Sequence, residues 1–555
     1  MGFALTNAQQ IFNDPTSIHY GFSAWLTNII AGVWLHFFGE ALGLIGFRFA
    51  SVLIVYATIF FAFLILKPYF KKEYVLIGLF LAELFIVRFY WINYNNLTAL
   101  FYVIAAYFII KGLQEHHDYF ILLSGFFLGL NIFNRISNIL GISLLLCIFV
   151  QGYWDTINTK ESIKSALFLI SGFIIAMLTI SGMMVYLGQF KLFINSILDL
   201  FFNYGLNPAS SYSGTGLLTL FIRDHFLAFS LIFISIIGFI LISKVYSWLT
   251  SHSSFVSTSF LLGLFLIGLA ISIVVSVGSY VIMVTYGLLC IILIKNIIWH
   301  CPDKKQLPLL SLISLLLLII TPLGSGNGML NAIYGMWLAI PISLIFLLGF
   351  TGLDLEIDLH IKNTILQKFR LELSKIETKK VVCLILISFL SFSLVSAYQY
   401  TYRDSADRFE MVYTVNHPSL KYVFTTEERA HVIQGLVDEL PHYIKKDDYV
   451  LAYENIPMVY YLTGSRPYLD NSWPDLYIPD QFSDKLNQSM KEKGVLPVIV
   501  RAKFNTRSFN WPDNTALPED ESSRINRDTL ERFIAVRNYT PAWNNEFFEI
   551  LTPGK

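Results

Sequence analysis

Charged side chains are scarce in most of this chain of 555 residues. They make up 14% of the sequence, whereas a soluble domain usually carries about 25%. The shortage is confined to residues 1–402, which hold 21 Lys and Arg and 16 Asp and Glu, while residues 403–555 hold 18 and 23. This division predicts a polytopic α-helical membrane protein followed by one soluble domain. It excludes a nucleic-acid-binding protein and a disordered chain.

Cysteine is almost absent as well. A count of four excludes a disulfide-rich secreted domain. The cysteines lie in or beside apolar segments without the spacing of metal ligands, so we expect packing roles, no metal site and no cofactor. The C-terminal part also lacks a glycine-rich phosphate loop and a nucleophile elbow. The four are Cys147, Cys290, Cys301 and Cys383.

Long apolar stretches fill the first 400 residues. A hydrocarbon core of about 30 Å needs roughly 20 apolar residues per helix. Residues 119–151 and 257–298 each allow a different division, because only two residues interrupt them. We predict about twelve membrane-spanning helices, at residues 44–66, 74–91, 95–111, 119–133, 135–151, 165–187, 218–243, 257–276, 279–298, 307–322, 331–350 and 380–399.

The distribution of Lys and Arg predicts the orientation. One set of alternate loops carries sixteen of them, and the opposite set carries four, Arg88, Arg135, Lys191 and Arg223. Positive side chains stay on the cytoplasmic side of a membrane. Twelve spans then leave both ends of the chain on the non-cytoplasmic side.

The N-terminal segment has no Lys or Arg before Arg48. Residues 21–38 are aromatic and moderately apolar but contain Asn28 and His36, which favours an interfacial helix over a span. Because nothing precedes this segment to carry it across, we expect a further helix upstream of Met1; the alternative is a short tail translocated without a signal. The predicted domains are a non-cytoplasmic loop with interfacial helices (1–43), a transmembrane helical domain (44–400) and a soluble extracytoplasmic α/β domain (401–555).

We expect short helices and strands in the soluble domain. We interpret this domain as a structural or acceptor-recognising cap on the membrane part. The patterns predict helices at 426–443, 455–464 and 527–538, strands at 447–453, 496–503 and 547–551, and loops at 470–490 and 505–525.

Polar residues gather on the predicted outer face of the membrane domain. Cations at this depth suit the phosphate of a lipid, and a carboxylate beside them could take the proton of an acceptor hydroxyl. Glu83 is the deepest predicted intramembrane acid, either a coupling group of a transporter or a carboxyl satisfied by a neighbouring helix. The candidate site residues are Asp14, His19, Tyr94, Arg135, Lys191, Arg223 and Asn327.

Several segments resemble a known family. The opening MGFALTNAQQIFND and the following YGFSAWLTNIIAGVWLHFFGEALGLIGFRFASVL are similar to the first outer loop and second span of the GT-C superfamily of integral-membrane glycosyltransferases. INYNNLTALFYVIAAYF, GFFLGLNIFNRISNILGI, the Gly-Ser-Gly-Asn-Gly run before WLAIP, and VYYLTGSRP are similar to further parts of such proteins. The chain particularly resembles the bacterial protein-mannosyltransferase and aminoarabinose-transferase group (glycosyltransferase family 39-like).

The resemblance implies transfer of a hexose or pentose from a polyprenyl-phosphate donor to a glycan, lipid or protein acceptor. The transfer would take place on the non-cytoplasmic side of a bacterial inner membrane, with inversion at the anomeric carbon. It also implies a catalytic acid just after the first helix. Met1-Gly2 aligns with the end of that motif, so we expect the acid upstream, and Asp14 is the remaining candidate base. Arg135, Arg223 and Lys191 are then candidates for contacts to the donor phosphate. His19, Tyr94 and Asn327 are candidates for other substrate contacts.

Two other interpretations stay open. A transporter or flippase for a lipid-linked or small substrate would use Glu83, although such proteins usually show internal repeats and none is visible here. A non-catalytic partner in polysaccharide assembly would fit if the acid is absent.

Overall fold

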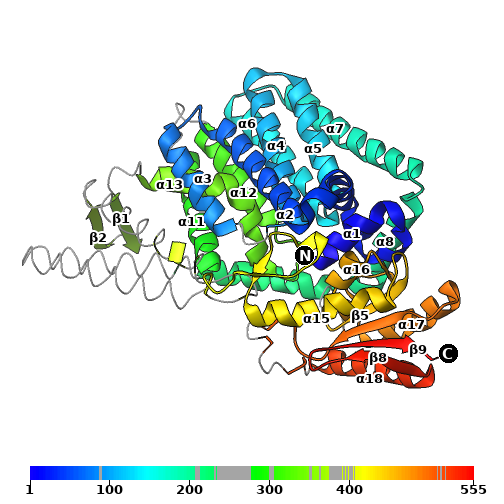
Figure 1. The fold of residues 1–555 in the computed structure, drawn as a ribbon. Coiled ribbons are helices and arrows are strands. Elements are labelled where there is room, and N and C mark those ends of the chain that lie inside the picture. Colours follow the sequence, from blue (N-terminus) through cyan, green and yellow to red (C-terminus); the bar gives the residue numbers. More distant parts are fainter. Residues whose placement is uncertain are drawn as a thin grey trace, which may run out of the picture.

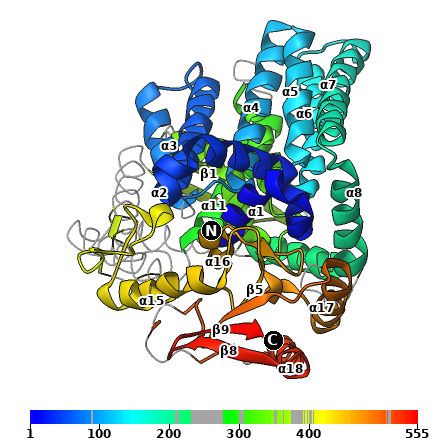
Figure 2. The same ribbon diagram turned by 45° about the vertical axis from the view of Figure 1, so that its right-hand side comes forward.

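A computed structural model gives the fold of most of the chain (Figure 1). The helices of the N-terminal two thirds form one body, and the small α/β domain packs against one end of it (Figures 1 and 2). The residues that the structure describes are 1–86, 90–206, 213–230, 233, 277–298, 306–348, 353–361, 364–373, 391, 394, 395, 398, 404, 407–508, 511–512, 516–518 and 520–554.

The first part is built from helices joined by short turns. Asn93 caps one of them, because its side-chain oxygen accepts the backbone N–H groups of Asn95 and Asn96 at 2.9 and 3.0 Å. Residues 214–230 are helical too, and two antiparallel strands, β1 (Leu353–Ile361) and β2 (Thr364–Leu373), follow the last helix of this part. The other elements are α1 (Gly2–Asn13), η1 (Pro15–Ala24), α2 (Trp25–Leu66), α3 (Lys72–Ile86), α4 (Tyr94–Glu115), α5 (Asp118–Ile132), η2 (Ile136–Leu144), α6 (Leu145–Trp154), α7 (Thr159–Tyr186), α8 (Phe190–Asp199), η3 (Leu200–Gly205), α11 (Val277–Ile298), α12 (Gln306–Ile320), η5 (Gly328–Gly335) and α13 (Met336–Leu348).

These helices are consistent with an integral membrane protein. Exposed apolar side chains such as Leu178 and Val185 on α7 suit contact with lipid. Shorter apolar helices cover Asp118–Ile132, Val281–Ile294 and Gln306–Ile320. Within the described part of the chain, five helical stretches are long and apolar enough to span a membrane: Pro15–Leu66, Tyr94–Glu115, Ile136–Trp154, Thr159–Tyr186 and Gly328–Leu348.

The predicted number of about twelve spans is therefore not confirmed. The predicted spans at 257–276 and, apart from four isolated residues, 380–399 lie outside the described residues, as does the second half of 218–243 apart from Phe233. The predicted spans at 135–151 and 331–350 each start as a 3-10 helix, η2 and η5, before becoming α6 and α13.

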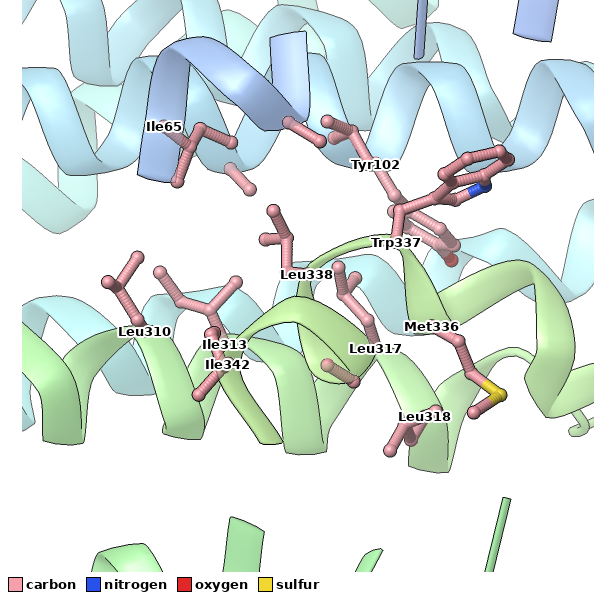
Figure 3. Close-up of a cluster of buried hydrophobic side chains, with 14 of the residues drawn as sticks. Ile65, Tyr102, Leu310, Ile313, Leu317, Leu318, Met336, Trp337, Leu338 and Ile342 are labelled. Carbon is pink, nitrogen blue, oxygen red and sulfur yellow. The ribbon is translucent and has the colours of Figure 1, made fainter. Parts of the chain in front are cut away.

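Close helix packing holds the membrane part together. Tyr102 of α4 and Trp337 of α13 are each 1% exposed and lie in a cluster with Leu317 of α12 (Figure 3). In the pair formed by α5 and α7, a Cβ added at Gly172 would lie 1.9 Å from the carbonyl oxygen of Leu122. The backbones of these two helices touch because glycine stands there.

A sharp break divides α2 at Gly43. This residue has φ +51° and ψ −138°, and a Cβ added to it would lie 2.6 Å from the carbonyl oxygen of Ser419 in the C-terminal domain. Glycine tolerates this backbone conformation and this close approach. Most of the predicted helix at 21–38 and the predicted span at 44–66 thus belong to the two halves of one broken helix, while residues 21–24 belong to η1.

The C-terminal domain has a five-stranded sheet in the order β6-β5-β7-β9-β8. β5 runs parallel to β6 and β7, while β9 is antiparallel to β7 and β8. A separate two-stranded pair, β3 (Tyr413–Thr414) and β4 (Phe424–Thr425), precedes it. The sheet strands are β5 (Tyr449–Tyr453), β6 (Arg466–Pro467), β7 (Val498–Ala502), β8 (Tyr539–Asn544) and β9 (Phe548–Pro553), and the helices are α15 (Glu427–Tyr443), α16 (Met458–Thr463), α17 (Pro479–Lys493) and α18 (Glu521–Val536).

Two helices of this domain correct the sequence prediction, since α18 already begins at Glu521, inside the predicted loop at 505–525. The predicted loop at 470–490 contains most of α17. Pro479 begins that helix, Gly494 with φ +64° ends it, and Phe482 and Leu486 on one face are buried. The polar composition of the segment concealed these helix signals.

Replacing Gly172 with Ala is expected to lower stability by about 2 kcal/mol, because the added methyl group forces α5 and α7 apart. Gly182→Ala is the matched control, since Gly182 lies on the same helix with nothing within 4 Å of an added Cβ. Thermal unfolding in detergent micelles measures both variants. Equal losses would show that the close contact between α5 and α7 does not stabilise the fold.

Candidate functional site

The N-terminal helix lies between the membrane helices and the C-terminal domain (Figure 2). Its Leu5 and Ile11 are completely buried. Thr6 Oγ1 donates to the carbonyl of Pro457 at 3.2 Å, and Gln10 Nε2 donates to the carbonyl of Ser465 at 3.1 Å. The helix is therefore anchored to α16 and to the turn that follows it.

Asp14 follows α1 and starts η1. Its Oδ1 accepts the hydroxyl of Thr16 at 2.5 Å, and its Oδ2 lies 3.5 Å from Nη1 of Arg466. The Asp14 side chain is 16% exposed. Both oxygens of this predicted base are thus already engaged, one of them by a cation of the C-terminal domain.

His19 belongs to η1 and contacts a second acid. Its Nε2 lies 2.6 Å from Oδ2 of Asp199 at the end of α8. The His19 side chain is 17% exposed and that of Asp199 is 45% exposed, so solvent reaches the pair. A histidine held at one ring nitrogen by a carboxylate can take a proton on the other nitrogen.

A buried ion pair lies next to η1. Lys493 Nζ donates to Asp470 Oδ1 at 2.7 Å, and the backbone N–H of Tyr20 donates to the carbonyl of Asp470. Burial raises the pKa of Asp470, and the nearby Lys493 opposes this rise. His19 also acts electrostatically on Asp470, which brings this pair into the same group as His19 and Asp199.

Aromatic rings line this region. Tyr20 packs edge-on against Tyr204 and Tyr477, with ring centroids 5.7 and 6.4 Å apart. Arg466 and Lys493 both lie over the ring of Tyr449, at 4.2 and 5.1 Å from its centroid. The polar members, which we name the junction cluster, are Asp14, His19, Asp199, Arg466, Asp470 and Lys493.

A second group surrounds the loop that follows α12. Arg135 donates to the backbone carbonyls of Thr321 and Leu323 at 2.9 and 2.7 Å. These carbonyls lie just after the carboxyl end of α12, where a cation is favourable. A role of Arg135 in binding a phosphate stays a prediction.

Arg223 is linked to the same loop through the adjacent residue Asp224. Its guanidinium lies 3.0 Å from Oδ1 of Asp224, while Oδ2 of Asp224 accepts the backbone N–H of Met329 at 3.1 Å. Asn327 is an exposed residue of this loop. We name Arg135, Arg223, Asp224 and Asn327 the outer-loop cluster, after the non-cytoplasmic side on which the sequence predicts this loop.

The predicted site residues thus divide between two groups. Asp14 and His19 fall in the junction cluster, and Arg135, Arg223 and Asn327 in the outer-loop cluster. Tyr94 begins α4, which packs against η5 beside that loop, and Lys191 is exposed on the same helix as Asp199.

Sequence reasoning missed Arg466, Asp470 and Lys493 as site residues. The first two lie in or just after the quoted segment VYYLTGSRP, and that resemblance was the only signal for them. Lys493 gave none. Within the described part of the chain, no group of three His, Cys, Asp or Glu residues could hold a metal ion.

A comparison with protein-family models gives no matching family, and a comparison with curated proteins gives no similar protein. The functional argument therefore depends on the geometry of the two clusters.

Replacing Lys493 with Met is expected to lower the stability of the protein by about 3 kcal/mol, because it leaves the buried Asp470 carboxylate unpaired. Lys491→Met, at an exposed position of the same helix, is the control and should change stability little. Adding Asp470→Asn to Lys493→Met should restore part of the loss. Thermal unfolding of the full chain measures all three, and a double variant no more stable than Lys493→Met would contradict the assignment.

Proposed function

We propose that the chain is a membrane glycosyltransferase that moves a sugar from a polyprenyl-phosphate donor to an envelope acceptor on the non-cytoplasmic side. The observation that carries the proposal is the His19–Asp199 pair, at 2.6 Å, in a solvent-accessible junction between apolar helices and a soluble domain. Such a position suits a reaction between a lipid-linked donor and a water-soluble acceptor group.

The reaction needs one base. The acceptor oxygen attacks the anomeric carbon, the bond from that carbon to the phosphate oxygen breaks, and its electron pair leaves with the polyprenyl phosphate. The acceptor hydroxyl loses its proton to His19, and Asp199 stabilises the imidazolium that forms. His19 fits this role better than Asp14, because Thr16 and Arg466 already occupy the Asp14 carboxylate.

The outer-loop cluster suits the donor. Arg223 is well exposed, with 69% of its side chain accessible. Leu218, Ile222 and Phe226 follow one another at helical spacing on the same helix and are exposed as well. A cation beside an apolar helical face suits a lipid phosphate whose polyprenyl chain lies along that face.

One observation favours the transporter interpretation as a second candidate. The Oε2 atom of Glu83 is buried on α3 and makes no hydrogen bond within the described part of the chain. A buried carboxyl of this kind is suited to binding and releasing a proton during transport.

Replacing His19 with Gln, or Asp199 with Asn, is expected to lower kcat by about 100-fold or more, because the acceptor proton then lacks its base. The assay uses the purified chain in liposomes with radiolabelled polyprenyl-phosphate hexose and pentose donors. His225→Gln is the control, since His225 contacts the Phe221 carbonyl and the Tyr286 hydroxyl instead.

The outcomes separate the alternatives. If the Asp14→Asn variant loses transfer activity while the His19→Gln variant keeps full activity, the base is Asp14 and not His19. If the unmodified chain transfers no label from any donor, the transferase proposal is wrong. A flux of labelled lipid across the liposome that Glu83→Gln abolishes would then favour transport.

A further inference from the structure

A separate cavity of about 300 Å³ opens in the C-terminal domain. It lies at the carboxyl ends of the parallel strands β5 and β7, which end at Tyr453 and Ala502, and α18 closes one side with Arg527 and Glu531. Ligands of open α/β sheets bind at this edge. In both views α18 lies on the side of the domain away from the membrane helices, so this cavity is distinct from the junction cluster (Figures 1 and 2).

The turn after β5 holds an unfavourable backbone conformation at this edge. Glu454 and Asn455 have φ values of +65° and +58°, which residues with a side chain rarely adopt. Thr506 Oγ1 donates to both of their carbonyls, at 3.3 and 3.1 Å, and Trp473 Nε1 donates to Asn455 Oδ1 at 2.6 Å. Strain held in place by surrounding contacts is typical of a functional site.

The turn places the Glu454 carboxyl in the cavity wall. Its side chain is only 6% exposed, and its Oε1 lies 3.3 Å from Nη1 of Arg527. Burial and the nearby Asp475 raise the pKa of Glu454 to about 7, while Arg527 opposes the rise. Near neutral pH this carboxyl therefore exists in both forms, able to accept or donate a hydrogen bond.

The charged groups in and around the cavity are already engaged by partners. Arg501 pairs with Glu531 and Glu549, and Lys503 Nζ donates to the side-chain oxygen of Asn544. Because carboxylates already engage the arginines, the cavity is a poor match for a phosphate or for an amine. Its wall offers many donors and acceptors, beside the apolar surfaces of Tyr453, Leu517 and Leu530. It carries three cations and two carboxyl groups, and the Glu549 carboxylate beside it pairs with Arg501.

We propose that this cavity binds one neutral saccharide unit. Sugar hydroxyls both donate and accept hydrogen bonds, so they match a wall of paired carboxylates and guanidinium groups. The C–H groups of the ring pack on the apolar residues. The ligand class deepens the proposed function, since a glycan acceptor would carry such a unit, but the binding does not require that the chain transfer sugar.

Saturation-transfer NMR on the full chain in lipid nanodiscs tests the proposal. The probes are glucose, galactose, mannose and N-acetylglucosamine as neutral sugars, with glucuronic acid, glucosamine and inorganic phosphate as charged ones. At least one neutral sugar should bind, and the charged probes should bind more weakly. Glu454→Gln and Arg527→Lys should each weaken the binding of that neutral sugar by about tenfold or more, because each changes a hydrogen-bonding group of the wall.

Glu492→Gln is the control, since Glu492 lies on α17 outside the cavity and hydrogen-bonds only to Gln488 among the contacts described. Thermal unfolding of each variant separates lost binding from lost folding. Absence of binding by all neutral sugars, tighter binding of a charged probe, or unchanged binding in a folded Glu454→Gln variant would overturn the proposal. Sugar binding without any transfer activity would support the saccharide cavity and reject the proposed transferase function. Transfer activity without sugar binding in this cavity would support the transferase function and reject the saccharide cavity.

Discussion

The burial of α1 between the membrane helices and the C-terminal domain is the contact on which the rest of the site depends. Leu5 of α1, Leu44 and Phe47 of α2, and Val415 and Tyr461 of the C-terminal domain form one apolar cluster. Burying apolar surface from three segments at once fixes their relative positions. Asp14 and His19 follow α1 directly, so this cluster determines where they meet Arg466 and Asp199.

Much of the fold follows from local patterns in the sequence. The helical spacing at 426–443 corresponds to α15, and the strands expected at 447–453 and 496–503 are present as β5 and β7. The short strands β6 and β8 escaped prediction, because two residues carry no periodicity and Pro541 interrupts the other. Hydropathy also leaves open how apolar residues divide into helices, as at 119–151, where η2 separates α5 from α6.

The sites were less accessible to prediction. Residue type and predicted side of the membrane suffice to select Asp14, His19, Arg135 and Arg223 as candidates. Their partners depend on tertiary contacts, since His19 and Asp199 lie 180 positions apart and Asp14 and Arg466 lie 452 apart. The saccharide cavity has no sequence motif, because a strained turn and charged side chains from three segments create it.

The break at Gly43 has a mechanical consequence. The carbonyl of Ser419 lies against Gly43, where α2 changes direction. The tilt of the apolar half of α2 after Gly43 is therefore coupled to the position of the C-terminal domain. A change in bilayer thickness that tilts this half of α2 would press on the 418–420 segment, and hence on Tyr461 of α16, which shares an apolar cluster with Leu420. In this way the lipid environment would act on the spacing of groups in the junction cluster.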